Sequence, residues 1–255
     1  EAYIHHLIEK AAELRVEANQ LLHMTQARFY QQILGIDSDA PKFKRRHDHA
    51  YYVGTSKLNS PRYRLDAFHY VGYVGDAEDL VTNSLTIGDM AKAYEPTLFK
   101  RPYTASSGVP FLSGIDLYNY YPKPHMYISS KMPKLENYRV KEGTILVQSD
   151  GSRYGLIGTP SYLPKHLDQV AVSEHLIRIY PLDSIDRGYI FIFLSTDIGR
   201  RLLLKHSFGS VMGNLFGQSI EETSIPLCKD SSLRQSFELD FQAICNMRES
   251  ANDLE

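Results

Sequence analysis

The first 34 residues carry one apolar pattern that constrains the fold more than any other part of the sequence. Its members recur at alternating spacings of three and four residues, the a and d stripe of a coiled coil: Ile4, Leu7, Ala11, Leu14, Ala18, Leu21 and Thr25. A helix of this length would extend roughly 50 Å, and Gly35 supplies a C-terminal stop. Because a narrow apolar stripe cannot be buried by one helix alone, this helix needs a partner.

The other end of the chain offers such a partner. Apolar residues line one face of the last 25 residues, and Ser232 with Gln235 fits a capping box at the start of a helix. The simplest arrangement pairs the two end helices antiparallel beside a globular body. We therefore expect an N-terminal spacer helix over 1–35, a body over 36–228 and a C-terminal helix over 229–255.

The body contains short apolar runs separated by Gly, Pro and Ser. Strands are expected at "VPFLSGIDL", "GTILVQ", "VAVSEHLIRIY" and "TSIPL", and short helices at "LTIGDMAKAY" and "RGYIFIFLSTDIGRRLLLKH". These elements do not follow a repeating βαβ order. The expected fold class is accordingly an irregular α+β domain flanked by two long helices, and not a doubly wound sheet.

Composition indicates how large a core the protein can bury and which cellular compartment suits it. A chain of 255 residues with 43% hydrophobic content can bury a sizeable core. Its two cysteines cannot build a disulfide framework, which favours a cytoplasmic location. The apolar run "YIFIFL" is far too short to span a bilayer. Because the chain opens at Glu1 inside a helical pattern, we expect a fragment of a longer polypeptide or a processed form.

Charge is unevenly distributed along the chain. The formal net charge is −2, yet seven basic residues and one acid, Asp48, lie between Lys42 and Arg64, interleaved with aromatic residues. Such a segment is typical of a nucleic-acid contact, and equally of a solvated basic face. Smaller basic spots recur at Lys100-Arg101 and at 200–205.

Searches for catalytic motifs are negative. The chain lacks a Walker loop, a dinucleotide fingerprint, an H-E-x-x-H helix, a nucleophile elbow and the N/D-P-P-Y/F tetrapeptide of amino-methyltransferases. His47 and His49 could bind a metal, but the neighbouring Arg45 and Arg46 would repel a cation. We therefore expect neither an independent enzyme nor a metal site.

Short motifs instead follow one another in a recognisable order along the body. They are "RLDA" at 64–67, "GVPFL" at 108–112, "VKEGTILVQSDGSRYGLIG" at 140–158, Gly188-Tyr189 through Gly199, Gly209-Ser210 with Leu215, and "IPL" at 225–227. This series, flanked by long helices, resembles the target recognition domains of specificity subunits of type I restriction-modification systems. The resemblance covers nearly the whole chain.

The resemblance implies a non-catalytic reader of double-stranded DNA. Family members look like two target recognition domains held apart by paired helices, each reading half of a split site. Since one such domain is present here, the chain looks like the C-terminal half of a specificity subunit, or a half-length form that pairs with a second copy. Implied partners are methyltransferase (modification) subunits, which bind S-adenosylmethionine, and a restriction subunit. No cofactor is expected in this chain, and the expected partner-binding helix residues are Leu7, Leu14, Leu21, Phe237, Phe241 and Ile244.

Candidate DNA contacts are basic, hydroxyl, amide, aromatic and glycine residues in expected loops. They are Ser60, Arg62, Lys100, Arg101, Tyr103, Ser106, Ser107, Ser149, Gly151, Ser152, Arg153, Tyr154, His206, Ser207, Ser210 and Asn214. Within "QSDGSRYGLIG", Gly151 would permit close backbone approach while Ser152 and Arg153 donate to phosphates or bases. Asp150 would be neutralised by Arg153 or accept from a cytosine amino group.

Several alternatives stay open at this point. The same loop is also explained as a tight turn whose glycines satisfy backbone angles. For Arg64 and Asp66, an internal salt bridge is favoured over a DNA contact. The chain is also consistent with the recognition domain of a fused single-chain restriction-modification enzyme, or with a coiled-coil interaction scaffold that does not bind DNA.

Overall fold

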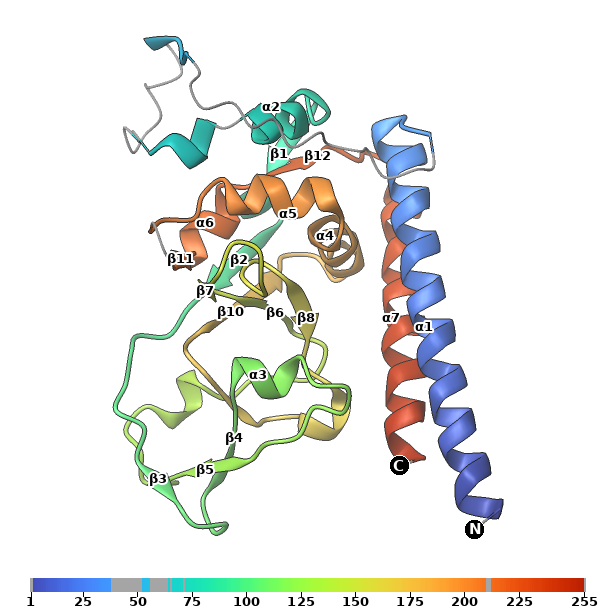
Figure 1. The fold of residues 1–255 in the computed structure, drawn as a ribbon, viewed down its shortest axis with the longest axis vertical. Helices are drawn as coiled ribbons and strands as arrows, with labels where there is room; N and C mark the ends of the chain where they lie inside the picture. The colour runs from blue at the N-terminus through green and yellow to red at the C-terminus, as the bar shows by residue number, and fades with distance from the viewer. Residues whose placement is uncertain are drawn as a thin grey trace.

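The computed structural model describes residues 2–37, 52–55, 64, 66–70, 72–209 and 212–254, and in it two long helices stand beside a mixed α+β body (Figure 1). Helix α1 spans Ala2–Leu34 and helix α7 spans Ser231–Asp253. The chain termini lie at the same end of the helix pair, so the two helices run antiparallel (Figure 1). The fold class expected from the sequence is confirmed.

Polar contacts fix the register of the helix pair. The guanidinium of Arg28 lies 2.7 Å from a carboxylate oxygen of Asp240, in the middle of α7. Near the end of α7, Arg15 donates to the Asn252 side chain at 2.9 Å. Since partners move backward along α7 as residue numbers rise along α1, the pairing is antiparallel throughout.

Local signals define where the two helices end. Gly35 has φ +65°, and the amide of Ile36 donates to the carbonyl of Tyr30 at 3.0 Å, the Schellman closure expected of a C-terminal glycine. The expected capping box at Ser232 is wrong. Asp230 is the N-cap, and its carboxylate accepts from the amides of Ser232 and Leu233, because an aspartate two residues earlier already satisfies the free amides of the first turn.

The helix pair and the body share one apolar core. The ring of Phe29 from α1 lies 5.5 Å from the ring of Phe237 and 5.2 Å from that of Tyr189 on helix α4 (Asp186–Ser195). A Cβ atom at Gly188 would approach the carbonyl oxygen of Phe237 to 2.4 Å, so glycine permits α4 to pack on α7. Phe241 joins the same core. The body is therefore not merely tethered to the helices but packed against them.

The expected partner-binding residues occupy two environments. Phe237, Phe241 and Ile244 are fully buried in the shared core, and Leu21 packs against that core while partly exposed. Leu7 and Leu14 are half-buried along α1. Docking of a partner through these positions stays a prediction. Because Phe237, Phe241 and Ile244 are buried, they would support docking by holding α7 in place.

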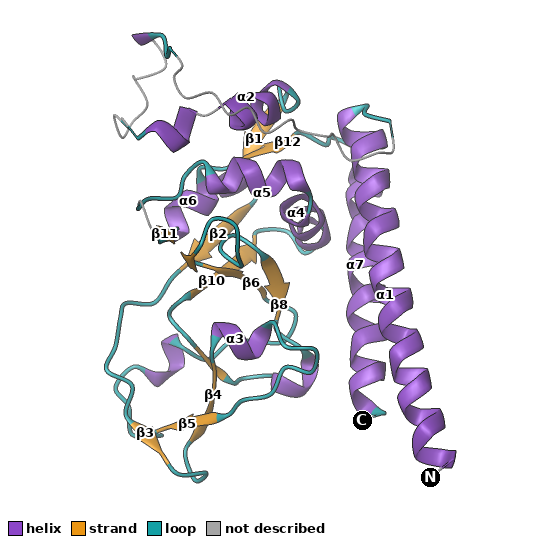
Figure 2. Cartoon of the chain, in the orientation of Figure 1, coloured by secondary structure: helices purple, strands orange, loops and turns teal. Residues whose placement is uncertain are grey.

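The upper sheet of the body has the strand order β2-β10-β6-β8 and is antiparallel throughout. Its central strands β6 (Ile145–Gln148) and β10 (Leu176–Pro181) are buried on both faces. Because successive side chains alternate across a strand, Ile145 and Val147 enter the core shared with the helices, whereas Leu146 enters a second core below. The upper sheet thus separates the two cores. In Figure 2 it lies between helices α4, α5 and α6 on one side and the lower strands on the other.

The lower sheet has the order β3-β5-β4-β9, in which β4 and β9 pair in parallel and the other neighbours pair antiparallel. Further elements cover the upper part of the body. The remaining bounds are α2 Gly72–Asp79, β1 Ser84–Thr86, β2 Ala91–Tyr94, β3 Tyr103–Thr104, β4 Val109–Leu112, α3 Gly114–Leu117, β5 Met126–Ile128, β7 Asp150–Gly151, β8 Pro160–Tyr162, β9 Ala171–Val172, α5 Asp197–Leu204, β11 Gly213–Asn214, α6 Gly217–Glu221 and β12 Ser224–Pro226, with short 3-10 turns at Ala67–Tyr70, Ile87–Asp89, Leu135–Asn137 and Lys165–Leu167.

The two short helices expected in the body differ from what the structure shows. The stretch "LTIGDMAKAY" was expected to be helical, which is wrong: it forms the end of β1, a 3-10 turn and β2, because pairing with β12 and β10 overrides the local propensity. The stretch from 187 to 206 forms two helices, α4 and α5. Thr196 separates them in an extended conformation, and its hydroxyl caps α5 by accepting from the Gly199 amide.

None of the helices within the described ranges is long and apolar enough to cross a membrane.

Candidate nucleic-acid interface

A small two-stranded sheet, extended by one bridged residue, forms the corner of the body where many of the expected contacts meet. Strand β7 pairs with β11, with Gly151 opposite Gly213 and Asp150 opposite Asn214. On the other side of β11, the backbones of Asn214 and Phe208 exchange hydrogen bonds of 2.8 and 2.9 Å. We call β7, β11 and Phe208 the corner sheet. It lies at the left edge of the molecule in Figure 1, away from the helix pair.

Arg153 braces the corner sheet from within the protein. Its Nε donates to the Ser207 hydroxyl at 3.0 Å and its Nη2 to the Gly209 carbonyl at 2.8 Å, while the guanidinium lies 4.0 Å from the centre of the Phe68 ring. The expected neutralisation of Asp150 by Arg153 is not what the structure shows. Asp150 instead lies 3.0 Å from His175. Arg153 therefore holds the 207–209 segment against the loop that follows β7.

The favoured reading of Arg64 and Asp66 is confirmed. Arg64 makes a bidentate ion pair with Asp66, at 2.7 and 2.8 Å, and also donates to the carbonyl of Ser207 at 2.7 Å. Its guanidinium stacks 4.0 Å from the Phe208 ring centre. Burial raises the pKa of Asp66, but the hydrogen bonds and charge of Arg64 outweigh it, so that the pKa is lowered overall. Two arginines thus clamp the same short segment.

Two arginines at the corner have neutral oxygens as their hydrogen-bond acceptors. Across the described ranges, Arg153 donates to a hydroxyl and a carbonyl, and Arg200 donates to the carbonyls of Gly155 and Ile157; neither contacts a carboxylate. Burial lowers the pKa of Arg200, although a guanidinium remains charged at neutral pH. Neutral oxygens satisfy these donors without removing their charge, which leaves the corner attractive to an anion.

The side chains at the corner differ in what they present to solvent. Ser152, Tyr154 and Asn214 are exposed, Tyr154 by 87%. Ser207, in contrast, is fully buried, and its hydroxyl accepts from Arg153. Of the remaining candidates here, His206 is half-buried. The structure thus brings these candidates together. The exposed ones are accessible to a partner, whereas the buried Ser207 has a structural role.

Two further candidates lie in the turn that begins the corner. Ser149 is half-buried and donates to the Asp150 carboxylate at 3.0 Å. Gly151 has φ +137°, a conformation that side-chain-bearing residues rarely adopt, and nothing lies within 4 Å of where its Cβ would be. The glycine is therefore required by backbone geometry rather than by crowding.

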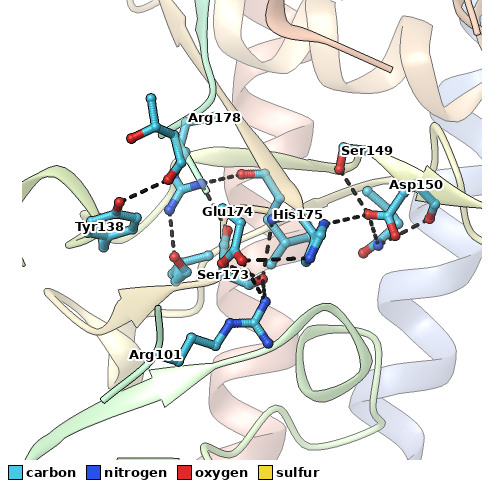
Figure 3. A network of polar contacts seen from close by, with 12 residues as sticks. Arg101, Tyr138, Ser149, Asp150, Ser173, Glu174, His175 and Arg178 are labelled. Carbon is cyan, nitrogen blue, oxygen red and sulfur yellow. Dashed lines mark hydrogen bonds and ion pairs between the residues drawn. The ribbon is translucent and has the colours of Figure 1, made fainter. Parts of the chain in front are cut away.

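A cleft of about 350 Å³ lies beside the corner sheet and contains a mixed network of charges. Arg101 donates to Glu174 at 2.8 Å, and Figure 3 shows His175 between Glu174 and Asp150, at 3.7 and 3.0 Å from their carboxylate oxygens. Exposed apolar side chains of Ile115 and Leu156 flank the network. Arg101, expected to contact DNA, is thus occupied by an internal carboxylate.

Arg178 fixes the loop that carries this network. It is fully buried and donates to the carbonyl oxygens of Val172, Ser173 and Leu176 at 2.5 to 2.9 Å (Figure 3). Burial lowers its pKa to about 10, so the side chain keeps its charge at neutral pH. Its role is to hold the backbone that presents Glu174 and His175.

The opposite wall of the cleft is the start of α3. Ser113 caps this helix, and the Asp116 carboxylate accepts from both the amide and the hydroxyl of Ser113, which forms a capping box. Burial raises the pKa of Asp116, but the hydrogen bonds from Ser113 and the neighbouring His125 lower it overall. Both walls of the cleft are therefore structurally fixed.

A third set of candidates surrounds β3 at the edge of the lower sheet. Lys100, Tyr103, Ser106 and Ser107 are all exposed. They do not join the corner sheet, since β3 and β11 belong to different sheets, and β3 lies near the bottom of Figure 1.

Other expectations fall outside the described residues. These are Ser60, Arg62 and Ser210, together with most of the basic segment from Lys42 to Arg64 and the histidines at 47 and 49. Within the described ranges, acidic, histidine and cysteine side chains do not gather into any group that could hold a metal ion.

Sequence reasoning missed several residues of this region. Glu174, His175 and Arg178 were hidden in a run that reads simply as a strand, and Met212 and Phe216 are apolar residues that usually indicate a core. A usable signal existed for the last two. The segment "MGNLF" alternates around Gly213 and Leu215 with a period of two, which places its first, third and fifth residues on one face of a strand.

The chain has similar solved structures and a matching family model among known proteins. A search of curated proteins finds no match. Among solved structures, the chain is similar to the HsdS subunit from Thermoanaerobacter tengcongensis (14% identity, 99% of this chain and 50% of that chain, TM-score 0.47) and to a type I restriction-modification S subunit from M. genitalium (14%, 99% and 55%, TM-score 0.49). It is also similar to the type IIG restriction endonuclease BpuSI (11%, 79% and 35%, TM-score 0.45).

The chain spans about half the length of the S subunits it matches. The family to which the chain belongs is shown by a family model. The family model described as "Type I restriction modification DNA specificity domain" matches residues 82–232, more than half of the chain. This segment contains both sheets of the body, the cleft and the corner sheet. The chain therefore belongs to the type I restriction-modification DNA specificity domain family.

Proposed function

We propose that this chain recognises a specific sequence of double-stranded DNA, as a specificity subunit or part of one. In this role it directs modification and restriction subunits to one half of a bipartite site. The observation that carries the proposal is the corner sheet, which lies inside the family segment. Asn214 in this sheet and Ser152 and Tyr154 in the loop after β7 are exposed, beside two arginines that are hydrogen-bonded to neutral oxygens.

The dimensions of the corner sheet suit the major groove of DNA. Two strands and the bridged residue Phe208, with neighbouring backbones about 4.8 Å apart, span roughly 10 Å, and the groove is about 12 Å wide. The exposed carboxamide of Asn214 can pair in a bidentate manner with adenine, while hydroxyl groups serve either phosphates or base edges. Arg153 and Arg200 would contribute mainly through the electrostatic field, because their donors are already engaged.

The assembled enzyme would supply the chemistry. We infer that a methyltransferase partner binds S-adenosylmethionine and docks on the helix pair, and that this chain contributes recognition without catalysis. The antiparallel α1 and α7, packed on the body through Phe29 and Phe237, would transmit the position of the corner sheet to such a partner.

A direct test is binding of the chain to mixed-sequence duplex DNA across a salt titration. Affinity should fall with salt at a slope of roughly −0.9 per phosphate contact on logarithmic axes. Selection from a random duplex library should then yield a preferred sequence. A matched titration with polyglutamate, an anion without bases, serves as the control. Failure to retain duplex DNA at about 50 mM salt would contradict the proposal and favour an interaction scaffold.

A further inference from the structure

Three side chains form an outward-facing row on and beside β11. Met212, Asn214 and Phe216 are exposed, whereas Gly213 and Leu215 between them are buried. This alternation is the period of two expected of a strand, so the three side chains point to the same face. We call Met212, Asn214 and Phe216 the β11 row.

The two ends of the β11 row are apolar and exposed to solvent. Met212 is 56% exposed and Phe216 is 44% exposed. Phe216 makes one described ring contact, with Phe208 at 5.9 Å between ring centres. An apolar, polar, apolar sequence on one exposed face indicates a contact surface with chemical selectivity.

The backbone beneath the β11 row is held firmly. Asn214 is hydrogen-bonded to Phe208, the amide of Leu215 donates to Ser149, and the amide of Phe216 donates to the Ser219 hydroxyl at 3.1 Å. The backbone from Asn214 to Phe216 is thus fixed by hydrogen bonds within the protein, which lowers the entropy cost of binding.

The charge around the β11 row favours a polyanion as its partner. Arg153 packs behind β11, because a Cβ at Gly213 would lie 3.4 Å from its side chain. Together with Arg200 it places cationic groups at the corner whose described contacts are neutral oxygens. DNA supplies both the negative charge and, in the major groove, exposed methyl groups of thymine between hydrogen-bonding base edges.

We propose, building on the DNA-recognition function above, that Met212 and Phe216 read thymine by contacting its C5-methyl group, on either side of the base pair that Asn214 contacts. Residues two apart on a strand are about 6.8 Å apart, and base pairs are stacked about 3.4 Å apart, so the three side chains address positions roughly two base pairs apart. A thioether and a phenyl ring have no hydrogen bonds to offer a base edge, but they bury a methyl group well.

The test replaces thymine by deoxyuridine, which removes the C5-methyl group and leaves base pairing intact. In the duplex preferred by the chain, each thymine is replaced in turn. At one or two positions the replacement should lower the affinity for DNA about fourfold, because the burial of one methyl group is lost. That loss should vanish in Met212→Ala at one position and in Phe216→Ala at the other, because the methyl group then has no partner.

Leu239→Ala provides the matched control. Leu239 is 56% exposed, as Met212 is, but lies on α7. This variant should keep the full sensitivity to deoxyuridine. Thermal melting of every variant establishes that the fold is intact, which is expected because the substituted side chains lie on the surface.

The outcomes separate this inference from the function on which it rests. Absence of any preferred sequence would contradict the proposed function itself. A clear preference that contains no thymine, or that tolerates deoxyuridine at every position, would overturn the reading of thymine while recognition stands. Loss of methyltransferase assembly in Met212→Ala and Phe216→Ala, with DNA discrimination unchanged, would also overturn it and make the β11 row a protein contact.

Discussion

The corner sheet and the neighbouring cleft contain similar residues but use them in opposite ways. At the corner, Arg153 donates to a hydroxyl and a carbonyl, so its charge persists at the surface. In the cleft, Arg101 is paired with Glu174. Asp150, which lies in β7 at the border of the two regions, contacts His175. The partner of each arginine therefore decides whether it can attract a phosphate. This difference supports the proposal that DNA contacts the corner sheet and that the cleft network has a structural role.

The largest expected effect concerns the cleft and is a loss of stability. Arg101→Met leaves Glu174, whose side chain is 6% exposed, without its guanidinium partner. We expect the free energy of unfolding, measured by urea denaturation, to fall by about 2–3 kcal/mol. This loss lies at or below the range usual for removing one partner of a buried ion pair, because Arg101 is itself partly exposed. Adding Glu174→Gln should restore most of it. A small loss, or no rescue, would show that the pair does not stabilise the cleft.

The next effect concerns base discrimination at the corner. Asn214→Ala should cost on the order of 1–3 kcal/mol at a single base pair and relax the preference there, because a bidentate contact to adenine is removed. Binding to single-base variants of the preferred duplex measures this. Asn137→Ala, an exposed amide near the lower sheet, is the control and should leave every position unchanged. Uniform weakening across all sequences would instead indicate a phosphate contact.

Backbone strain at the corner should have a smaller effect. Gly151→Ala should destabilise the protein by about 1 kcal/mol, since φ is +137° while nothing obstructs the new methyl group. Gly75→Ala is the matched control: it is equally uncrowded but lies inside helix α2 without a positive φ, and it should be neutral or stabilising. If the two variants melt alike, the turn at Gly151 does not require glycine.

The smallest expected effect is a difference in acid sensitivity. Burial lowers the pKa of His69, which lies behind the corner, with the charges of Lys205 and Arg64 adding to the shift. A lowered histidine pKa favours the neutral form in the folded protein. Its contribution to stability is therefore complete above the ordinary value of 6.5 and is lost as pH falls below it. Asp116 at the cleft, with a lowered pKa, loses its contribution only below 3.8.

Unfolding free energies measured between pH 7 and 5 test this difference. Stability should decline over that interval in the wild type and decline less in His69→Gln, while Asp116→Asn should leave the slope unchanged. Identical slopes in the wild type and His69→Gln would remove His69 as the cause.

Much of the architecture could be predicted from the sequence, because it depends on local patterns. The stripe from Ile4 to Thr25 and the stop at Gly35 follow from periodicity and from glycine geometry, and the pairing of the end helices follows from the need to bury that stripe. The "LTIGDMAKAY" segment could not be predicted, since strand pairing with residues more than 80 positions away determines its conformation.

The site was less predictable for a related reason. Residue type identified Arg153 and Arg101 equally, but their roles depend on partners distant in sequence, Ser207 in one case and Glu174 in the other. Exposure likewise separates Asn214 from the buried Ser207, although both were expected in loops. Such differences arise from tertiary packing, which composition and spacing do not encode directly.

A paired salt titration tests the assignment of DNA contact most directly. Arg153→Gln removes charge at the corner, and the double variant Arg101→Gln with Glu174→Gln removes the paired charges of the cleft at constant net charge. We expect Arg153→Gln to weaken binding and to lower the slope of log affinity against log salt by less than one, since its donors are engaged within the protein, while the double variant binds like the wild type. Thermal melting confirms that both are folded. A slope unchanged in Arg153→Gln and reduced in the double variant would contradict the account and place the DNA at the cleft.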